Sequence, residues 1–187
     1  AAANFHGTDS FVVSVTDDDA GNTETQTISI TVTQVNDAGT FGGNTSGSGA
    51  EDGGAITGTL TFTDAADGAT APNFTVTTDG TNGTASIDSV SGFWSYSPGA
   101  NFNGTDSFVV SVTDDAGNTE TQTISITVTQ VNDAGTFGGN TSGSGAEDGG
   151  AITGTLTFTD TADGATSPNF TVTTDGTNGT ATRSEEH

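Results

Sequence analysis

Apolar side chains alternate with threonine or serine along several short segments of the chain. Between residues 56 and 62, for example, Ile56, Leu60 and Phe62 alternate with threonines. Alternation with a period of two places successive side chains on opposite faces of a strand, and threonine favours the extended conformation. Each such segment therefore predicts a strand with one buried face and one solvated face. The segments with this pattern are 56–62, 74–77, 94–96, 108–113 and 124–129.

Turn-forming residue pairs separate these segments. Asp79-Gly80, Asn82-Gly83, Ser91-Gly92 and Asn103-Gly104 are dipeptides whose backbone conformations suit tight turns. An apolar period of 3.6 and helix-capping sequences are both absent. Many short strands joined by glycine and asparagine turns predict an all-β sandwich or barrel, with about seven strands in a complete unit.

The chain repeats itself with a period of 96 residues. The paired segments are 4–18 with 101–115, 20–37 with 116–133, and 38–86 with 134–182. Apart from an additional Asp19, the copies differ at only four positions, which one copy fills with His6, Thr161, Ser167 and Thr182. A period of this length fits one sandwich domain of immunoglobulin size and is too long for most solenoids.

The phase of the repeat predicts three domain segments. Residues 38–133 form a complete β-sandwich repeat, residues 1–37 are the C-terminal half of a repeat, and residues 134–187 are the N-terminal half of another. A half sandwich leaves apolar faces and strand edges bare. We therefore expect either head-to-tail assembly, in which half domains of neighbouring copies complete each other, or a segment of a longer repeat array. The total length, close to two periods, suits the first.

The charge of the chain excludes several partners. The sequence has 24 acidic residues, one arginine, no lysine and no cysteine, and its formal net charge is −23. Such a chain repels nucleic acid and anionic membrane surfaces, and no apolar run approaches the roughly 18 residues of a membrane span. Apolar residues are few, so the core is thin, and we expect folding to depend on divalent cations that neutralise carboxylates.

Several sequence elements resemble a known family. The elements are Val131-Asn132-Asp133-Ala134, Ala50-Glu51-Asp52-Gly53, and the stretches 58–67, 92–98 and 101–108. In order and spacing they resemble the VCBS and cadherin-like tandem repeats of giant bacterial surface proteins. The resemblance implies an Ig-like β-sandwich, an extracellular or cell-surface location, and an extender role in RTX-type adhesins, filaments and biofilm proteins. The sequence departs from the family at Gly135, where proline is usual, so the linker between repeats is expected to be less rigid.

Calcium is the cofactor that the resemblance implies, and acidic residues cluster where loops are expected. Calcium is bound by hard oxygen ligands from carboxylates and carbonyls. The alternative is that these residues only form and solvate turns, and no EF-hand or glycine-rich calcium nonapeptide occurs. In one arrangement, the boundary Asn-Asp pair meets a Glu-Asp loop and an Asp-x-x-Asp loop at one end of the domain. The candidate ligands are Asn36, Asp37, Glu51, Asp52, Asp64, Asp67, Asp114, Asp115, Asn132, Asp133, Glu147, Asp148, Asp160 and Asp163.

Catalysis is not expected. The two histidines are His6, which the other copy replaces with Asn103, and the last residue, His187. Neither is placed as a catalytic base would be, and repeated surface acids do not define a single active site. Trp94 and Tyr96 are expected to fill the core, the alternative being a platform for carbohydrate. The sequence thus predicts a structural repeat that contacts neighbouring copies, with a glycan- or cell-binding adhesin module as the alternative.

Overall fold

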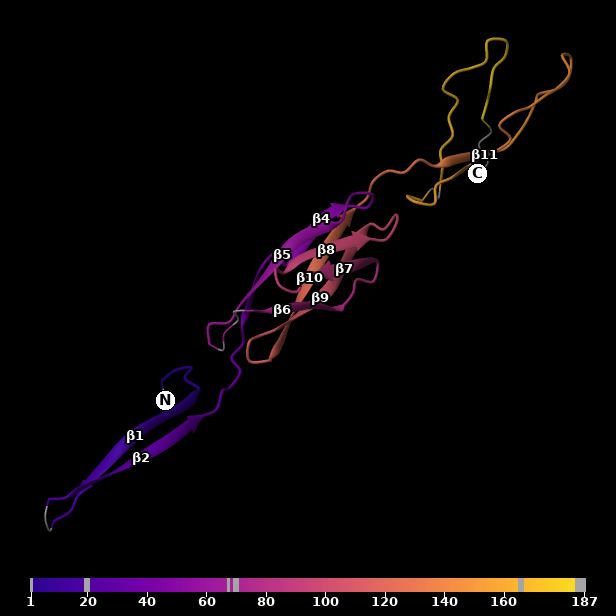
Figure 1. The fold of residues 1–187 in the computed structure, drawn as a ribbon. Helices are drawn as coiled ribbons and strands as arrows, with labels where there is room; N and C mark the ends of the chain where they lie inside the picture. The colour runs from indigo at the N-terminus through magenta and orange to yellow at the C-terminus, as the bar shows by residue number, and fades with distance from the viewer. Residues whose placement is uncertain (1, 19–20, 67, 69–70, 165–166, 184–187) are drawn as a thin grey trace. The chain divides into compact units, whose positions relative to one another are not determined.

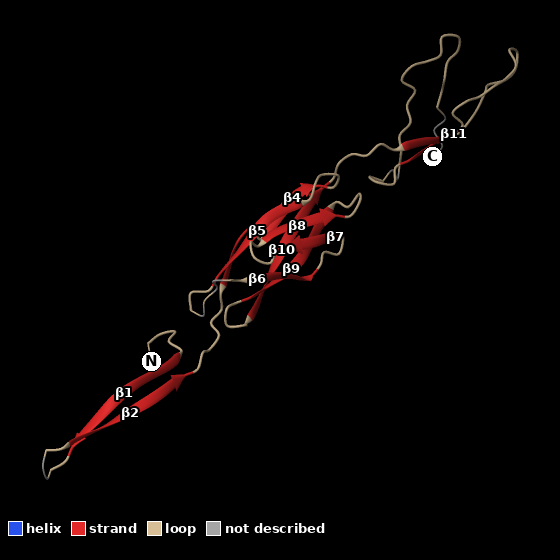
Figure 2. Cartoon of the chain, in the orientation of Figure 1, coloured by secondary structure: helices blue, strands red, loops and turns tan. Residues whose placement is uncertain are grey.

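The computed structural model describes residues 2–18, 21–66, 68, 71–164 and 167–183, and their only regular secondary structure is β-strand (Figure 2). The chain divides into two compact units, residues 1–129 and 130–187. In the first unit the strands are β1 (Gly7–Thr16), β2 (Thr23–Val32), β3 (Thr40–Gly43), β4 (Ser46–Ala50), β5 (Ile56–Thr63), β6 (Asn73–Thr78), β7 (Gly83–Ile87), β8 (Phe93–Pro98), β9 (Gly104–Thr113) and β10 (Thr119–Thr129). In the second they are β11 (Thr136–Gly139) and β12 (Leu156–Thr159).

Strands β3 to β10 form a β-sandwich, which confirms the predicted fold class (Figure 1). One sheet has the order β4-β10-β9-β6 and the other the order β3-β5-β8-β7. All pairs are antiparallel except β4 with β10, which run parallel. The two remaining pairs, β1 with β2 and β11 with β12, are isolated two-stranded sheets.

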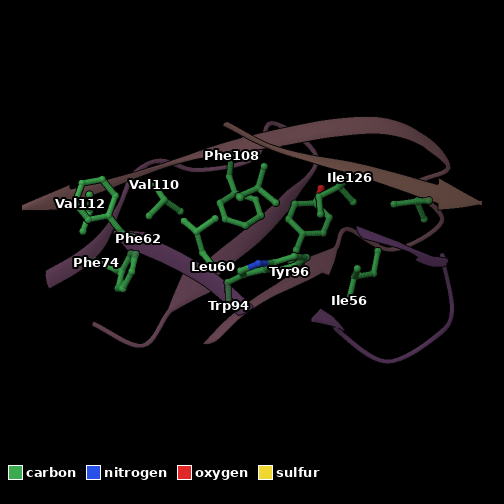
Figure 3. Close-up of a cluster of buried hydrophobic side chains, with 12 residues drawn as sticks. Ile56, Leu60, Phe62, Phe74, Trp94, Tyr96, Phe108, Val110, Val112 and Ile126 are labelled. Atoms are coloured by element: carbon green, nitrogen blue, oxygen red, sulfur yellow. The ribbon is translucent and has the colours of Figure 1, made fainter. Parts of the chain in front are cut away.

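The core lies between the two sheets and is built around aromatic rings (Figure 3). Trp94, Tyr96 and Phe108 have no exposed surface. The ring of Phe108 meets Trp94 edge-on at a centroid distance of 5.7 Å and stacks parallel to Tyr96 at 6.2 Å. Each such buried side chain contributes about 1.5–3 kcal/mol through the hydrophobic effect. The predicted inward faces of β5, β9 and β10 supply the aliphatic residues around these rings.

Two glycine-rich strands were not evident from apolar alternation. The expected number of strands in residues 38–133 was about seven, whereas the structure has eight there, including β3 and β4. A Cβ atom at Gly47 would lie 2.8 Å from a ring carbon of Trp94, and one at Gly49 would lie 2.8 Å from Ile56. The large side chains thus fill the space that side chains of β4 would need, so the sequence signal of β4 is glycine at every second position.

Candidate functional site

The predicted ligand loops of one repeat lie at opposite ends of strand β5. Glu51 and Asp52 precede the strand and Asp64 follows it. A strand of eight residues spans about 26 Å. The Glu-Asp loop and the Asp-x-x-Asp loop therefore do not meet within one repeat, which corrects the expected single-ended arrangement. Asp67, like Asp19 and His187, lies outside the described residues.

At the Asp64 end, carboxylates hold two loops in place. Asp114 Oδ1 accepts hydrogen bonds from the backbone N–H groups of Ala116 and Asn118, at 2.9 and 2.8 Å. Asp115 Oδ1 accepts one from Ala71 N–H at 3.2 Å, which ties the loop after β9 to the loop after β5. Asp64 and Asp114 are each only 8% exposed. These acids stabilise the turns themselves, as expected of aspartate at loop positions.

Hydrogen bonding lowers the pKa of Asp114. Burial alone would raise the pKa of this carboxyl, because an apolar environment disfavours the charged form. The hydrogen bonds donated by Asn118, from backbone and side chain, and by the backbone of Ala116 and Gly117 together outweigh burial. Asp114 is thereby held as a carboxylate, the form that stabilises the loop.

Glu120 at the same end was missed by the sequence reasoning. Its Oε1 accepts a hydrogen bond of 2.9 Å from Gly39 N–H at the entrance to β3, while Oε2 is a buried oxygen with no hydrogen-bond partner among the residues that the structure describes. The available signal was the strand period, since Glu120 stands four residues before Ile124 and so on the core-facing side of β10. A carboxylate on that face is partly buried at the end of the sandwich and is not a fully solvated surface group.

The opposite end of the sandwich contains Glu51. This residue is 6% exposed, its Oε2 accepts a hydrogen bond of 3.4 Å from Asn103 Nδ2, and its N–H donates to Thr129 O at 3.1 Å. Glu51 thereby joins the loop after β4 to the end of β10. The neighbouring Asp52 is exposed.

In the second unit, the boundary segment and the Asp-x-x-Asp loop come together. Asp163 Oδ2 accepts a hydrogen bond of 2.6 Å from Asp133 N–H, and its Oδ1 accepts one of 2.9 Å from Gln130 Nε2. Asp160 Oδ1 in turn accepts a hydrogen bond of 3.0 Å from Asp163 N–H. The corresponding residues Asn36 and Asp37 are exposed, as are Asn132, Glu147 and Asp148.

No group of three or more acidic, histidine or cysteine side chains in the described part of the chain is arranged to hold a metal ion. The donor chemistry suits calcium, because the loops are rich in carboxylate oxygens. Their oxygens are instead directed at backbone N–H groups, as in Asp114 and Asp163. The ligand assignments therefore stay a prediction.

Tyr96 and Asp106 form a partly buried polar contact that no sequence motif indicated. Tyr96 Oη donates a hydrogen bond of 2.6 Å to Asp106 Oδ2, and burial raises the pKa of Tyr96 above its usual range. For Asp106, burial would raise the pKa, but the hydrogen bonds from Tyr96 and from three backbone N–H groups outweigh it and lower the pKa. Trp94 Nε1 likewise donates to Asn44 O at 2.9 Å.

The burial of Trp94 and Tyr96 decides between the two roles considered for them. Both have no exposed surface, so neither ring can stack on a bound sugar. A shallow depression of about 520 Å³ lies beside Asp106 and has no aromatic side chain in its lining. These two rings are core residues, and the depression is lined mainly by polar residues, with Ile126 also in the lining.

Comparison with known proteins gives a family and a solved structure. The family model for bacterial cadherin-like domains matches residues 36–130. The crystal structure of Drosophila N-cadherin EC1-3 is similar at 18% sequence identity and a TM-score of 0.40; the match covers 67% of this chain and 56% of that chain. No curated protein matches. Among the described residues, no helix is long and apolar enough to cross a membrane.

Proposed function

Because the chain belongs to the family of bacterial cadherin-like domains, we propose that it is a structural extender repeat of an extracellular filament or large bacterial surface adhesin, acting in cell adhesion or a biofilm matrix. Domains of this family are typically extracellular and generally not enzymes. The role that we assign to the chain is mechanical: its repeats add length to the filament or adhesin and resist bending.

The observation that carries this proposal is where the chain enters and leaves the sandwich. The chain enters β3 at Thr40, which pairs with Thr63 at the far end of β5. It leaves β10 at Thr129, which pairs with Ala50 at the opposite end of the sandwich. Because entry and exit lie at opposite ends, a following repeat starts from the end of the sandwich opposite the entry of the chain, which supports an extender role. The eleven residues of β10 span about 36 Å, and we expect each repeat to add about that length.

We further propose that calcium binds at the loop ends and stiffens the array. Cadherin-like domains generally bind calcium, and a chain of net charge −23 must offset strong repulsion between its carboxylates. The idea is supported by the position of the boundary segment next to the Asp-x-x-Asp loop, where the backbone N–H of Asp133 donates to Asp163 Oδ2; an ion bound there would take the place of that N–H as the partner of the carboxylate. An ion that binds only the folded state stabilises that state by mass action.

Insertion of further repeats tests the extender role. Additional copies of residues 38–133 placed after Asp133 should lengthen the particle by a constant increment of about 36 Å or more per copy, measured by small-angle X-ray scattering or electron microscopy. If the particle instead grows as a compact globule does, without a constant increase in length per copy, the repeats do not act as extenders.

A calcium titration tests the ion separately. Thermal unfolding followed by the fluorescence of Trp94, the single tryptophan, should show a higher Tm in calcium than in a sodium or magnesium salt of equal ionic strength. Chelation should reverse the increase. In calorimetric binding, Asp163→Asn should weaken calcium uptake, whereas Asp9→Asn on the exposed strand β1 makes the same charge change and should not. Equal Tm values in all three salts would mean that the ions act only by general charge screening, and would contradict specific calcium binding.

A further inference from the structure

Two asparagine–glycine pairs lie in the complete repeat, and their surroundings differ. One is Asn82-Gly83 in the turn before β7, and the other is Asn103-Gly104 at the start of β9. Both asparagines are exposed. Asparagine is a thermolabile residue, and a following glycine has no Cβ atom to hinder an approach to its own backbone nitrogen. The asparagine amide is therefore open to attack by the glycine nitrogen wherever both groups are unconstrained.

The backbone nitrogen of Gly83 points away from its sheet. β7 is an edge strand that pairs with β8, and alternate residues of an antiparallel strand direct their N–H and C=O groups at the partner. The carbonyl of Asn82 accepts from Gly99 N–H, so the even-numbered residues face β8. On the outer edge, Ala85 N–H donates to Asp79 Oδ1 instead. Gly83 lies on this outer edge, and its N–H makes no hydrogen bond to the described loop residues.

The side chain of Asn82 is also unconstrained. Its amide group makes no hydrogen bond to any residue that the structure describes, and it lines the shallow depression of about 520 Å³ beside Asp106, which is open to water. The main chain of Asn82 is fixed, because its N–H donates to Asp106 Oδ2 and its carbonyl accepts from Gly99 N–H, both at 2.7 Å. A free backbone nitrogen, a free side-chain amide and water are thus together in one turn.

The second asparagine–glycine pair is constrained at both groups. Asn103 Nδ2 donates to Glu51 Oε2 at 3.4 Å, which restrains the side-chain amide. The ladder between β9 and β10 continues into the hydrogen bond from Asp114 N–H to Asn118 O, so the even-numbered residues of β9 direct their N–H groups at β10. Gly104 is one of these residues. Its nitrogen can attack the asparagine only after this part of the ladder has opened.

We propose that Asn82 is a site of spontaneous deamidation in the folded protein, whereas Asn103 is shielded from this reaction. The Gly83 nitrogen attacks Cγ of Asn82, and the new N–Cγ bond closes a succinimide ring while the Cγ–Nδ2 bond breaks. The displaced amide nitrogen leaves as ammonia and takes the proton of the Gly83 N–H with it. Water then adds to either carbonyl and opens the ring, so the product is aspartate or isoaspartate. Water is the one co-reactant.

Deamidation changes both the charge and the backbone of this turn. Either product adds a carboxylate to a turn that already contains Asp79 and contacts Asp106. Isoaspartate also lengthens the main chain by one methylene before Gly83. There is no free space for the resulting shift on the core side, since a Cβ atom on Gly83 would overlap the ring and hydroxyl of Tyr96. The products therefore disturb the hydrogen bond from Tyr96 to Asp106, and the sandwich loses stability as the protein ages.

A time course on the full chain compares the two sites directly. Chymotrypsin, which cleaves after aromatic residues, releases peptides 75–93 and 103–108. Each peptide contains one asparagine, Asn82 and Asn103 respectively. After incubation of the folded chain at mildly alkaline pH, mass spectrometry should show deamidation of 75–93 at least about tenfold faster than of 103–108, because the ladder at Gly104 must open first. In urea, where both turns are unfolded, the two rates should be similar.

Two glutamine variants test the effect on stability. Glutamine keeps the amide group but is one methylene longer, so it cyclises far more slowly than asparagine. Each aged sample is compared with a fresh sample of the same variant by the Trp94 unfolding transition. The Tm of the wild type and of Asn103→Gln should fall with age, while the Tm of Asn82→Gln should stay constant. Fresh N82Q should match the fresh wild type, because the Asn82 side chain makes no hydrogen bond that glutamine would lose.

The possible results are decisive in both directions. Equal deamidation of the two peptides in the folded chain overturns the proposal, as does a peptide 75–93 that reacts in urea but stays intact in the folded chain. A wild-type Tm that stays constant while Asn82 reacts, or that falls equally in N82Q, overturns the assigned effect on the sandwich. Deamidation at this turn depends on the fold of the complete repeat alone, so these results and the test of the extender role are independent.

Discussion

Tyr96 Oη lies 2.6 Å from Oδ2 of Asp106 and donates a hydrogen bond to it from inside the core. The tyrosine is fully buried, and the same carboxylate accepts backbone hydrogen bonds from Thr81 and Asn82 in the turn before β7. One aspartate thus links the centre of the core to the β6–β7 turn and to strand β9.

Removal of the tyrosine hydroxyl should destabilise the sandwich modestly. Tyr96→Phe keeps the ring stacked on Phe108 but removes a hydrogen bond to a charged acceptor, a loss of about 1–2 kcal/mol because solvent still reaches Asp106. Denaturant unfolding followed by Trp94 fluorescence measures the change. A double-mutant cycle with Asp106→Asn gives the coupling between the two groups. A coupling of zero, with the pKa of Asp106 unchanged in Y96F, would contradict the assigned role.

The lowered pKa of Asp114 predicts a specific pH dependence. The folded-state pKa lies below the ordinary value of 3.8, so the carboxylate stabilises the fold above that pH, and this contribution is lost as the pH falls through the folded-state pKa. The difference in unfolding free energy between wild type and Asp114→Asn should be constant near neutral pH and should shrink below about pH 4. Comparison with D114N cancels the general relief of charge repulsion in acid. A difference that stays constant to about pH 2 would contradict the prediction.

Two glycines in identical sequence surroundings should respond differently to alanine. A Cβ at Gly58 would overlap the ring of Trp94, whereas a Cβ at the corresponding Gly154 would meet only Asn140. Gly58→Ala should therefore lower the stability of the sandwich by about 1–3 kcal/mol through overpacking. Gly154→Ala should leave the Trp94 unfolding transition unchanged. Equal effects of the two substitutions would mean that contact with Trp94 is not the cause.

Amide hydrogen exchange should differ between two copies of the same sequence. The amides of 46–50 that pair with β10 should be protected, while those of 142–146, which are loop, should exchange rapidly. NMR on chains that are isotope-labelled in one half distinguishes the two copies. Mass spectrometry does not distinguish them, because the two copies give identical short peptides. Equal protection of the two segments would contradict this prediction.

For much of the candidate site, the sequence predicted which residue types are present but not which of them lie close together. The sequence indicated that the acids lie in loops, and Asp64, Asp114 and Asp163 do so. It did not indicate that Glu51 and Asp64 lie at opposite ends of the sandwich, since this depends on the direction of β5. Nor did it indicate that Tyr96 reaches Asp106, because that contact depends on how the two sheets face each other.

The sequence by itself determined the local capacity to form strands, the positions of the turns and the period of 96 residues. The tertiary structure decided which of those strands exist. Residues 56–59 are strand and pair with β8, while the identical residues 152–155 are loop and pair with no strand in the described part of the chain. Alternation places apolar groups on one face of a strand, but only a partner strand satisfies its backbone hydrogen bonds and only a second sheet removes that face from water.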